Sequence, residues 1–225
     1  MTRVVDGDTL WIAASEQVRL LGVNTPELGA SGAEGRLARQ ARQRVAARLA
    51  GGRVLLVEGR RRRDAHGRLL AHAFAPDGAS LAAELVGAGL GWHVAIPPDL
   101  DLAPCLADLE RAARREKRGV WRLPATPAGA VRREGFQRVV GRVVRVSFGR
   151  SWWLSLEGAV AVRIPPQSQP LFERRHLGRL VGRRVEVRGW LHPNPSRGHE
   201  PWRVELPSPY HLQVSAGKSG AAGLD

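Results

Sequence analysis

The chain of 225 residues is poor in several residue types. Cys105 is the only cysteine, so an intrachain disulfide is excluded and cysteine usage says nothing about redox compartment. No apolar run approaches the ~18 residues that a membrane-spanning helix requires. Tyr210 is the only tyrosine, and Lys117 and Lys218 are the only lysines. These absences exclude a disulfide scaffold and a helical membrane protein.

Positive charge is abundant, and nearly all of it is arginine. The formal net charge is +14, and 43% of residues are hydrophobic, enough for ordinary cores. Arginine is permanently charged and presents a fork of donors that matches phosphate oxygens. An excess of this size favours a polyanionic partner such as nucleic acid. Coding bias and solubility are the alternative explanation.

The start of the chain bears on localisation. The first motif begins three residues after Met1, so we expect no signal peptide and a cytoplasmic protein for the chain as written. If the true start lies upstream, a secreted or periplasmic protein is expected instead. Cys105 lies among Leu102, Leu106 and Leu109, and we expect it to be a small core residue.

The first half reads as a small α+β domain. The period-four spacing of Leu37, Ala41, Val45 and Leu49 predicts an amphipathic helix with an arginine-rich outer surface. The expected elements are strands over 2–12, 17–23, 53–60 and 68–74, a loop over 61–67, and helices over 34–50, 80–86 and 101–118. This composition predicts a barrel of three to five strands with three helices.

The second half is mainly short strands. Pro124 to Gly129 is the best linker candidate, which gives domains at 1–123 and 136–214, a linker at 124–135 and a disordered tail at 215–225. The expected elements are strands over 139–146, 152–156, 160–164, 185–190 and 202–206, with a helix over 169–180. Five strands with a helix after the third predict an OB-fold-like barrel.

Three short segments carry the chemistry. They are Val4–Thr9 (VVDGDT), Val18–Glu27 (VRLLGVNTPE) and Asp64–Arg68 (DAHGR). Together they supply carboxylates for a hard cation, two arginines for a phosphate and a glutamate that can activate water. In this order and spacing, over about residues 2–123, they resemble the staphylococcal nuclease (thermonuclease) family.

The resemblance implies a calcium-dependent hydrolase of DNA and RNA that cleaves the P–O5′ bond to leave 3′-phosphates. It implies a five-stranded OB-type barrel with three helices. By position, Asp8 and the Thr25 carbonyl match calcium ligands, and Asp6 matches an acid behind the metal. Arg19 and Arg68 match the two arginines that clamp the phosphate. Glu27 matches the carboxylate that activates water.

Each segment also has an ordinary structural explanation when taken alone. Residues 6–8 suit a β-turn, and residues 25–27 suit a turn or a helix entry. Arg19 suits a solvent-facing strand position, and Arg68 is one more charge in an arginine run. Joint occurrence in one order is what favours a functional site.

The chain departs from the family pattern in two places. Asn24 stands where the family has a second metal-binding aspartate, so one negative charge is lost and weaker calcium binding is expected. The positions that often carry lysine and tyrosine hold Ala65 and His66. Either His66 or Trp92 is a candidate for stacking on a base, and core packing is an equally open explanation of Trp92.

The second half shows no metal or nucleophile constellation. Four tryptophans permit two readings, core packing or platforms on which bases stack; they are Trp152, Trp153, Trp190 and Trp202, with Arg142, Arg145, Arg150 and Arg163 available to follow a nucleic-acid backbone. A packing or protein-contact module is equally open.

The leading interpretation is a monomeric calcium-dependent nuclease acting on single-stranded or flexible DNA or RNA, with no small-molecule cofactor. A non-catalytic nucleic-acid-binding protein is the first alternative, because Asn24 removes a metal-binding charge. A scaffold that recruits a protein partner is the second.

Overall fold

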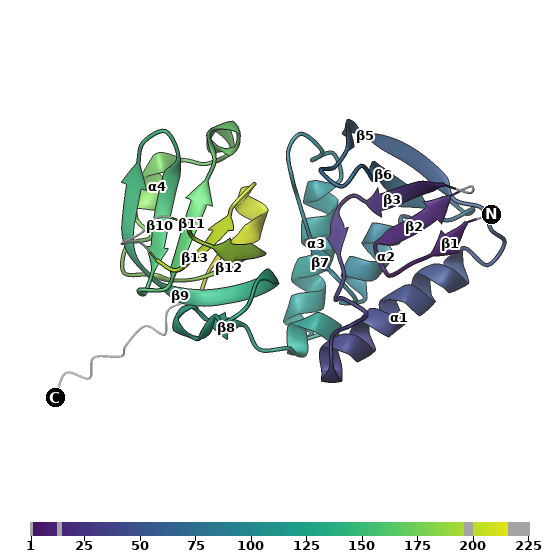
Figure 1. Cartoon of the computed structure of the whole chain (residues 1–225), viewed down its shortest axis with the longest axis horizontal. Coiled ribbons are helices and arrows are strands. Elements are labelled where there is room, and N and C mark those ends of the chain that lie inside the picture. The colour runs from purple at the N-terminus through teal and green to yellow at the C-terminus, as the bar shows by residue number, and fades with distance from the viewer. Residues whose placement is uncertain (1, 13–14, 196–199, 216–225) are drawn as a thin grey trace. The chain divides into compact units, whose positions relative to one another are not determined.

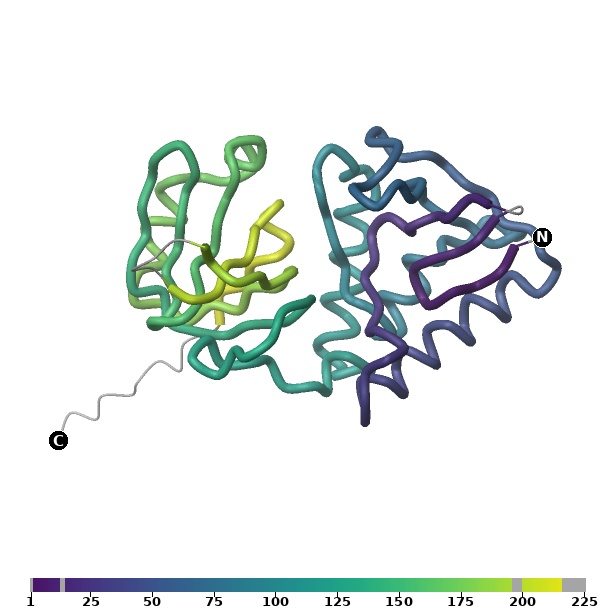
Figure 2. Tube along the Cα trace, viewed as in Figure 1, coloured from purple at the N-terminus to yellow at the C-terminus, as the bar shows by residue number. Residues whose placement is uncertain are grey.

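A computed structural model describes residues 2–12, 15–195 and 200–215. The chain divides into two compact units, Met1–Pro124 and Ala125–Asp225, and Figure 2 shows that it passes from one to the other once. The tail expected at 215–225 lies outside the described residues apart from Ser215. No helix of the described part is long and apolar enough to cross a membrane.

The first unit is a five-stranded sheet with three α-helices (Figure 1). Its elements are β1 Arg3–Val4, β2 Thr9–Ile12, β3 Glu16–Leu20, β4 Val23–Asn24, α1 Gly32–Arg48, β5 Leu55–Arg63, β6 Leu69–Phe74, α2 Leu81–Gly87, β7 Trp92–His93, α3 Ala103–Arg115 and a 3-10 helix Gly119–Arg122. The order in the sheet is β1-β2-β3-β6-β5, and β3 pairs with β6 in parallel. Leu10, Val18, Leu20 and residues of all three helices form its core.

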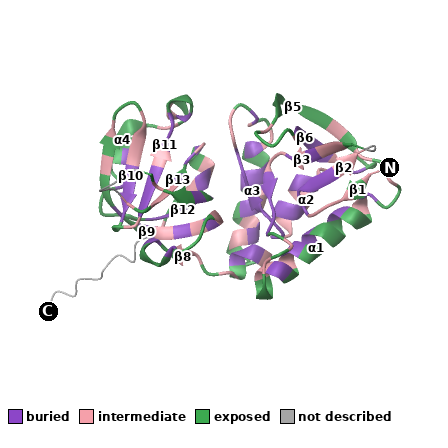
Figure 3. Cartoon of the chain, viewed as in Figure 1, coloured by how far each residue is buried: buried purple, intermediate pink, exposed green. Residues whose placement is uncertain are grey.

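Several local expectations differ from the structure. Residues 2–12 form two antiparallel strands rather than one, because Arg3 pairs with Trp11 and the chain turns between them. Strand β5 continues to Arg63, so the expected loop shortens to residues 64–68, and β5 is exposed along most of its length (Figure 3). Cys105 is exposed, which makes the core prediction wrong, because the buried face of α3 passes through Leu106.

The second unit is mainly β. Its elements are β8 Thr126–Pro127, a 3-10 helix Ala128–Ala130, β9 Gly135–Phe148, β10 Trp152–Leu156, β11 Val160–Ile164, a 3-10 helix Pro166–Leu171, α4 Arg174–Gly178, β12 Arg184–Pro193, β13 Trp202–Glu205, a 3-10 helix Pro209–His211 and β14 Leu212–Val214. The pairings β9–β10–β11–β13–β12 return to β9, so these five strands close on themselves. Strands β11 and β13 are parallel.

The expected linker at 124–135 contains ordered structure. Strand β8 pairs with β9, and Ala128 and Val131 are buried in the core of the second unit. The helix expected at 169–180 is also interrupted, since Phe172 and Glu173 adopt extended backbone between the 3-10 helix and α4. Proline-rich composition marks the first segment, but burial of Ala128 and Val131 orders it. The second segment contains one proline, Pro170.

Both units share one order of strand connections. Three strands are joined as an antiparallel meander, a helix follows, and a later hairpin places its second strand parallel to the third strand. In the first unit, Arg19 lies on β3 of this parallel pair, and Arg68 directly precedes β6.

Candidate active site

The turn between β1 and β2 holds two carboxylates. The Asp6 Oδ1 atom accepts a hydrogen bond from the Asp8 backbone N–H at 2.9 Å. A Cβ at Gly7 would lie 2.6 Å from both the Ala41 Cβ and the Thr25 Cγ2, so only glycine lets this turn approach α1 and Thr25 so closely. The segment is therefore both a turn and the element that positions Asp8.

Asp8 is buried and hydrogen-bonded on both carboxylate oxygens. Its Oδ2 accepts from the Thr25 backbone N–H at 2.6 Å and from the Thr25 hydroxyl at 3.0 Å. Its Oδ1 accepts from the Thr9 hydroxyl at 3.1 Å and lies 3.3 Å from the Arg19 Nε. These contacts join the β1–β2 turn to the chain that follows β4.

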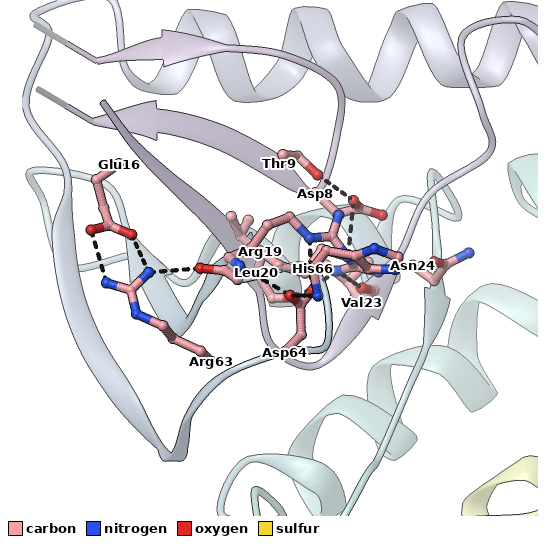
Figure 4. Close-up of polar contacts among 12 residues, drawn as sticks. Asp8, Thr9, Glu16, Arg19, Leu20, Val23, Asn24, Arg63, Asp64 and His66 are labelled. Atoms are coloured by element: carbon pink, nitrogen blue, oxygen red, sulfur yellow. Dashed lines mark hydrogen bonds and ion pairs between the residues drawn. The ribbon is translucent and has the colours of Figure 1, made fainter. Parts of the chain in front are cut away.

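Arg19 lies on β3 with its guanidinium fixed in orientation. Its Nη1 donates to the Leu20 carbonyl at 2.6 Å and to the Val23 carbonyl at 2.7 Å. The other edge of the fork, Nε and Nη2, faces oxygens of Asp8 and Asn24, with Nη2 to Asn24 Oδ1 at 2.9 Å. Figure 4 draws this group of contacts. The Nε–Nη2 edge is the one that binds a phosphate or carboxylate in bidentate fashion.

Asn24 and Thr25 are held beside Arg19 by β4. This strand pairs with β7, with Asn24 opposite Trp92. The Asn24 side chain uses both of its groups, because Oδ1 accepts from Arg19 and Nδ2 lies 3.4 Å from the Thr25 carbonyl. Trp92 is 5% exposed, which favours core packing over stacking on a base.

Electrostatics at the turn favour a cation. Burial, and then the negative charge of Asp8, raise the pKa of Asp6 to about 6. Hydrogen bonds from the Asp8 N–H and the Thr9 hydroxyl and the charge of Arg19 oppose this rise. A bound cation would relieve the repulsion that raises the pKa of Asp6.

Arg68 follows the turn between β5 and β6. Leu70 pairs with Arg19 across the parallel strands, and Arg68 lies two residues before Leu70, so alternation places Arg68 on the face that carries Arg19. Its Nε donates to Asp64 Oδ2 at 2.7 Å, and its backbone N–H donates to Asp64 Oδ1. The Nη groups have no protein partner in the described ranges, and the side chain is 26% exposed.

Asp64 orients Arg68 and was not expected from the sequence. Partial burial raises the pKa of Asp64, but hydrogen bonds from the Arg68 side chain and from the Arg68 and His66 N–H groups outweigh it, so the pKa lies below its ordinary value. Arg63 supports the same turn, because its Nη1 donates to the Gly67 carbonyl and to Glu16. The spacing of Asp64 and Arg68 was the available signal. His66 is exposed in this turn.

Glu27 is exposed just after the buried Pro26. Its backbone carbonyl accepts from the Ala30 N–H at 3.0 Å, which bends the chain toward α1. In the part of the chain that the structure describes, its carboxylate has no ion pair or hydrogen bond, so it is free to accept a proton from water.

The oxygen atoms gathered here suit a hard cation. Carboxylates of Asp6 and Asp8, the Asn24 amide oxygen and the Thr25 carbonyl are the ligand types that calcium takes. Over the described ranges, here as elsewhere, no group of three or more His, Cys, Asp or Glu side chains is arranged to hold a metal ion. These donor types suit calcium, but only two of them, Asp6 and Asp8, are carboxylates.

Comparison with known proteins identifies the family of the chain. The model of the family described as "Staphylococcal nuclease homologue" matches residues 17–123. Proteins named "Uncharacterized endonuclease" from Escherichia coli O157:H7 and Escherichia coli are each 30% identical over 124 residues, which cover 54% of this chain and 74% of theirs. The resemblance to the staphylococcal nuclease family is confirmed over residues 17–123, and the chain belongs to that family.

Proposed function

We propose that this protein is a calcium-dependent nuclease that hydrolyses phosphodiester bonds of DNA or RNA. Water adds to phosphorus and the P–O5′ bond breaks, which leaves a 3′-phosphate and a free 5′-hydroxyl. The observation that carries the proposal is the fixed fork of Arg19, whose Nε–Nη2 edge faces oxygens of Asp8 and Asn24. An edge of this kind matches two phosphate oxygens.

In this proposal the two arginines grip the scissile phosphate. Arg19 presents a fork already fixed by two backbone carbonyls, and Arg68 presents the Nη groups that Asp64 leaves free. Negative charge grows on the phosphate oxygens in the pentacovalent transition state, and donors fixed in advance stabilise it without reorganisation. Loss of one such donor typically costs about 10²–10³ in rate.

Glu27 is the proposed general base. It is exposed and has no ion pair among the described residues, so its carboxylate can take a proton from the attacking water. General-base catalysis of this kind contributes roughly 10²–10⁴ to the rate.

Asp8, Asn24 and the Thr25 carbonyl would hold the calcium ion, with Asp6 behind them. When bound, the ion supplies positive charge next to the phosphate oxygens. Arg19 partly neutralises the same carboxylate, through its 3.3 Å contact with Asp8. This competition and the missing carboxylate at position 24 both predict weak calcium binding.

A nucleic-acid-binding protein without catalysis is the second candidate. It is favoured by Asn24, whose Oδ1 is committed to Arg19 and carries no charge. Retention of Glu27 and of both arginines favours the enzyme, since a binder has no need of a base at this position.

We propose that the second unit is an OB-fold-like accessory barrel, because its strands are connected in the same order as those of the first unit. Its support is the closed ring of five strands with a parallel β11–β13 pair and α4 after the third strand. The protein is proposed to act as a monomer on single-stranded or flexible nucleic acid.

The experiment is a calcium titration of single- and double-stranded DNA degradation, with a chelator control and Glu27→Gln alongside. Glu27→Gln keeps the shape of the side chain and removes its basicity, so cleavage should fall by about 10²–10⁴ while oligonucleotide binding persists. Wild-type protein that binds DNA but leaves it intact at high calcium would exclude the enzyme and leave the binder.

A further inference from the structure

The outer face of β10 and β11 in the second unit contains a hollow. Leu154 and Leu156 of β10 point into the core, so alternation directs Trp153 and Ser155 outward. Across the strands, Ser155 pairs with Arg145 on β9 and with Ala161 on β11. The two short side chains, Ser155 and Ala161, form the low floor between larger neighbours.

The hollow is a cavity of about 220 Å³. Trp153 and Arg145 line it from the sheet, and Asn194 and Glu200 line it from the segments that flank β12 and β13. Drug-sized ligands and cofactors occupy pockets of roughly 300–1,000 Å³. The cavity is therefore too small for a whole cofactor and suits one planar ring with polar edges.

Trp153 differs from the other tryptophans of its barrel. Trp152 packs on the core and on Phe148, Trp190 contacts Phe136 edge to face, and Trp202 packs on the core. Trp153 is half-buried, and in the described residues it has neither a ring partner nor a cation above it. Its outward ring is available for stacking.

A free positive charge lies beside this ring. Arg145 is exposed and has no ion pair in the described ranges, whereas Arg142 faces Glu157 and Arg163 is paired with Glu205. An aromatic platform next to an uncommitted arginine is the combination that binds a base and its phosphate in single strands.

We propose that this face binds single-stranded nucleic acid, with one base stacked on Trp153 in the hollow and a neighbouring phosphate on Arg145. The polar residues Ser155, Asn194 and Glu200 also line the hollow. A base in a duplex is stacked on its neighbours and cannot enter, so the site selects unpaired strands. The inference does not depend on calcium or on cleavage by the first unit.

The test is fluorescence anisotropy of a labelled ten-nucleotide single-stranded DNA of mixed sequence, with the same sequence as a duplex for comparison. The full chain is used in chelator and with Glu27→Gln as the background, so hydrolysis plays no part. Trp153→Leu should weaken single-strand binding at least about fivefold and leave duplex binding unchanged. Trp190→Leu, at the exposed tryptophan elsewhere on the same barrel, is the matched control and should change neither.

Arg145→Ala gives a second, independent measurement at an exposed position that does not threaten folding. It should lower the slope of log affinity against log salt by about 0.7 for the single strand. Unchanged single-strand affinity in Trp153→Leu would overturn the proposal, as expected if the hollow takes a protein segment instead. Equal loss on single strand and duplex would also overturn it, because base stacking predicts a difference.

Discussion

Asn24→Asp tests whether position 24 lies at the cation site. The Asn24 Oδ1 accepts from Arg19, and its Nδ2 lies 3.4 Å from the Thr25 carbonyl. An aspartate keeps an acceptor toward Arg19, adds a negative charge and removes the amide group next to the Thr25 carbonyl. The variant should therefore bind calcium more tightly and cleave at lower calcium concentration.

The size of the effect follows from charge and burial. Two unit charges about 4 Å apart interact by about 4 kcal/mol at an effective dielectric constant of about 20. The new carboxylate is attracted to Arg19 as well, and Asn24 is only 6% exposed, so burial opposes part of this gain. We expect a net gain of roughly 1.4–3 kcal/mol, which is about 10–100-fold in calcium affinity.

Without calcium the same substitution should destabilise the protein. A third carboxylate joins Asp6 and Asp8, and the pKa of Asp6 is already raised to about 6 by burial and by Asp8. We expect a cost on the order of 1–2 kcal/mol in the free energy of unfolding, reduced by the attraction to Arg19. Excess calcium should reverse the order, so that the variant melts above the wild type.

The assay combines calorimetric calcium titration with thermal unfolding in chelator and in excess calcium. Asn24→Ala is the matched control, because it removes the acceptor for Arg19 without adding charge and should weaken calcium binding. If Asn24→Asp leaves both the calcium affinity and the calcium midpoint for cleavage unchanged, position 24 does not contact the cation and the proposed ligand set is incorrect.

Three further outcomes are expected. Arg68→Ala should lower the cleavage rate about 10²–10³-fold in the gel assay, and Arg68→Lys should restore little of it, because a point charge lacks the fork that Asp64 orients. Burial lowers the pKa of His72 from its usual 6.5, so the neutral ring is favoured in the fold. The contribution of His72 to the free energy of unfolding is therefore complete above pH 6.5 and falls below it. His72→Gln should flatten that fall in urea unfolding between pH 7.5 and about 5.5. Gly119→Ala should cost about 1–3 kcal/mol in urea unfolding, because φ is +46° and a Cβ would lie 2.0 Å from the Gly89 carbonyl oxygen; an unchanged midpoint would contradict this.

The sequence predicts the neighbourhood of the candidate site because the residues lie at strand ends that must pair. Thr9 of β2 is opposite Arg19 of β3, and Arg19 is opposite Leu70 of β6. A short antiparallel hairpin and a parallel strand therefore bring the three segments together. The helix periodicity is equally informative, since Ala41 and Val45 are buried as their four-residue spacing requires.

The orientation of side chains within the site is not predictable in the same way. The fork of Arg19 is fixed by the carbonyls of Leu20 and Val23. The positions of these carbonyls depend on the turn at Gly22, where φ is +87°. Backbone carbonyls carry no sequence signal. For the same reason the commitment of Asn24 to Arg19 could not be deduced from the replacement of a carboxylate alone.

Burial of single residues was the weakest part of the prediction. Cys105 was grouped with Leu102, Leu106 and Leu109, yet one helical step of about 100° separates it from Leu106 and carries it to the solvent side. Trp92 is covered because β7 pairs with β4. Composition identifies residues able to enter a core, whereas register and helical phase decide which of them do.

The shared strand order of the two units separates framework from chemistry. In the first unit the parallel pair β3–β6 brings Arg19 and Arg68 to one face, and the β1–β2 turn adds two carboxylates. In the second unit the corresponding parallel pair, β11–β13, carries Arg163 opposite Glu205, and these two side chains form an ion pair. The free aromatic surface lies instead one strand away, on β10. One framework can therefore accommodate the candidate hydrolytic site at a turn and the proposed stacking surface on an outer face, and the residues rather than the connectivity decide which is present.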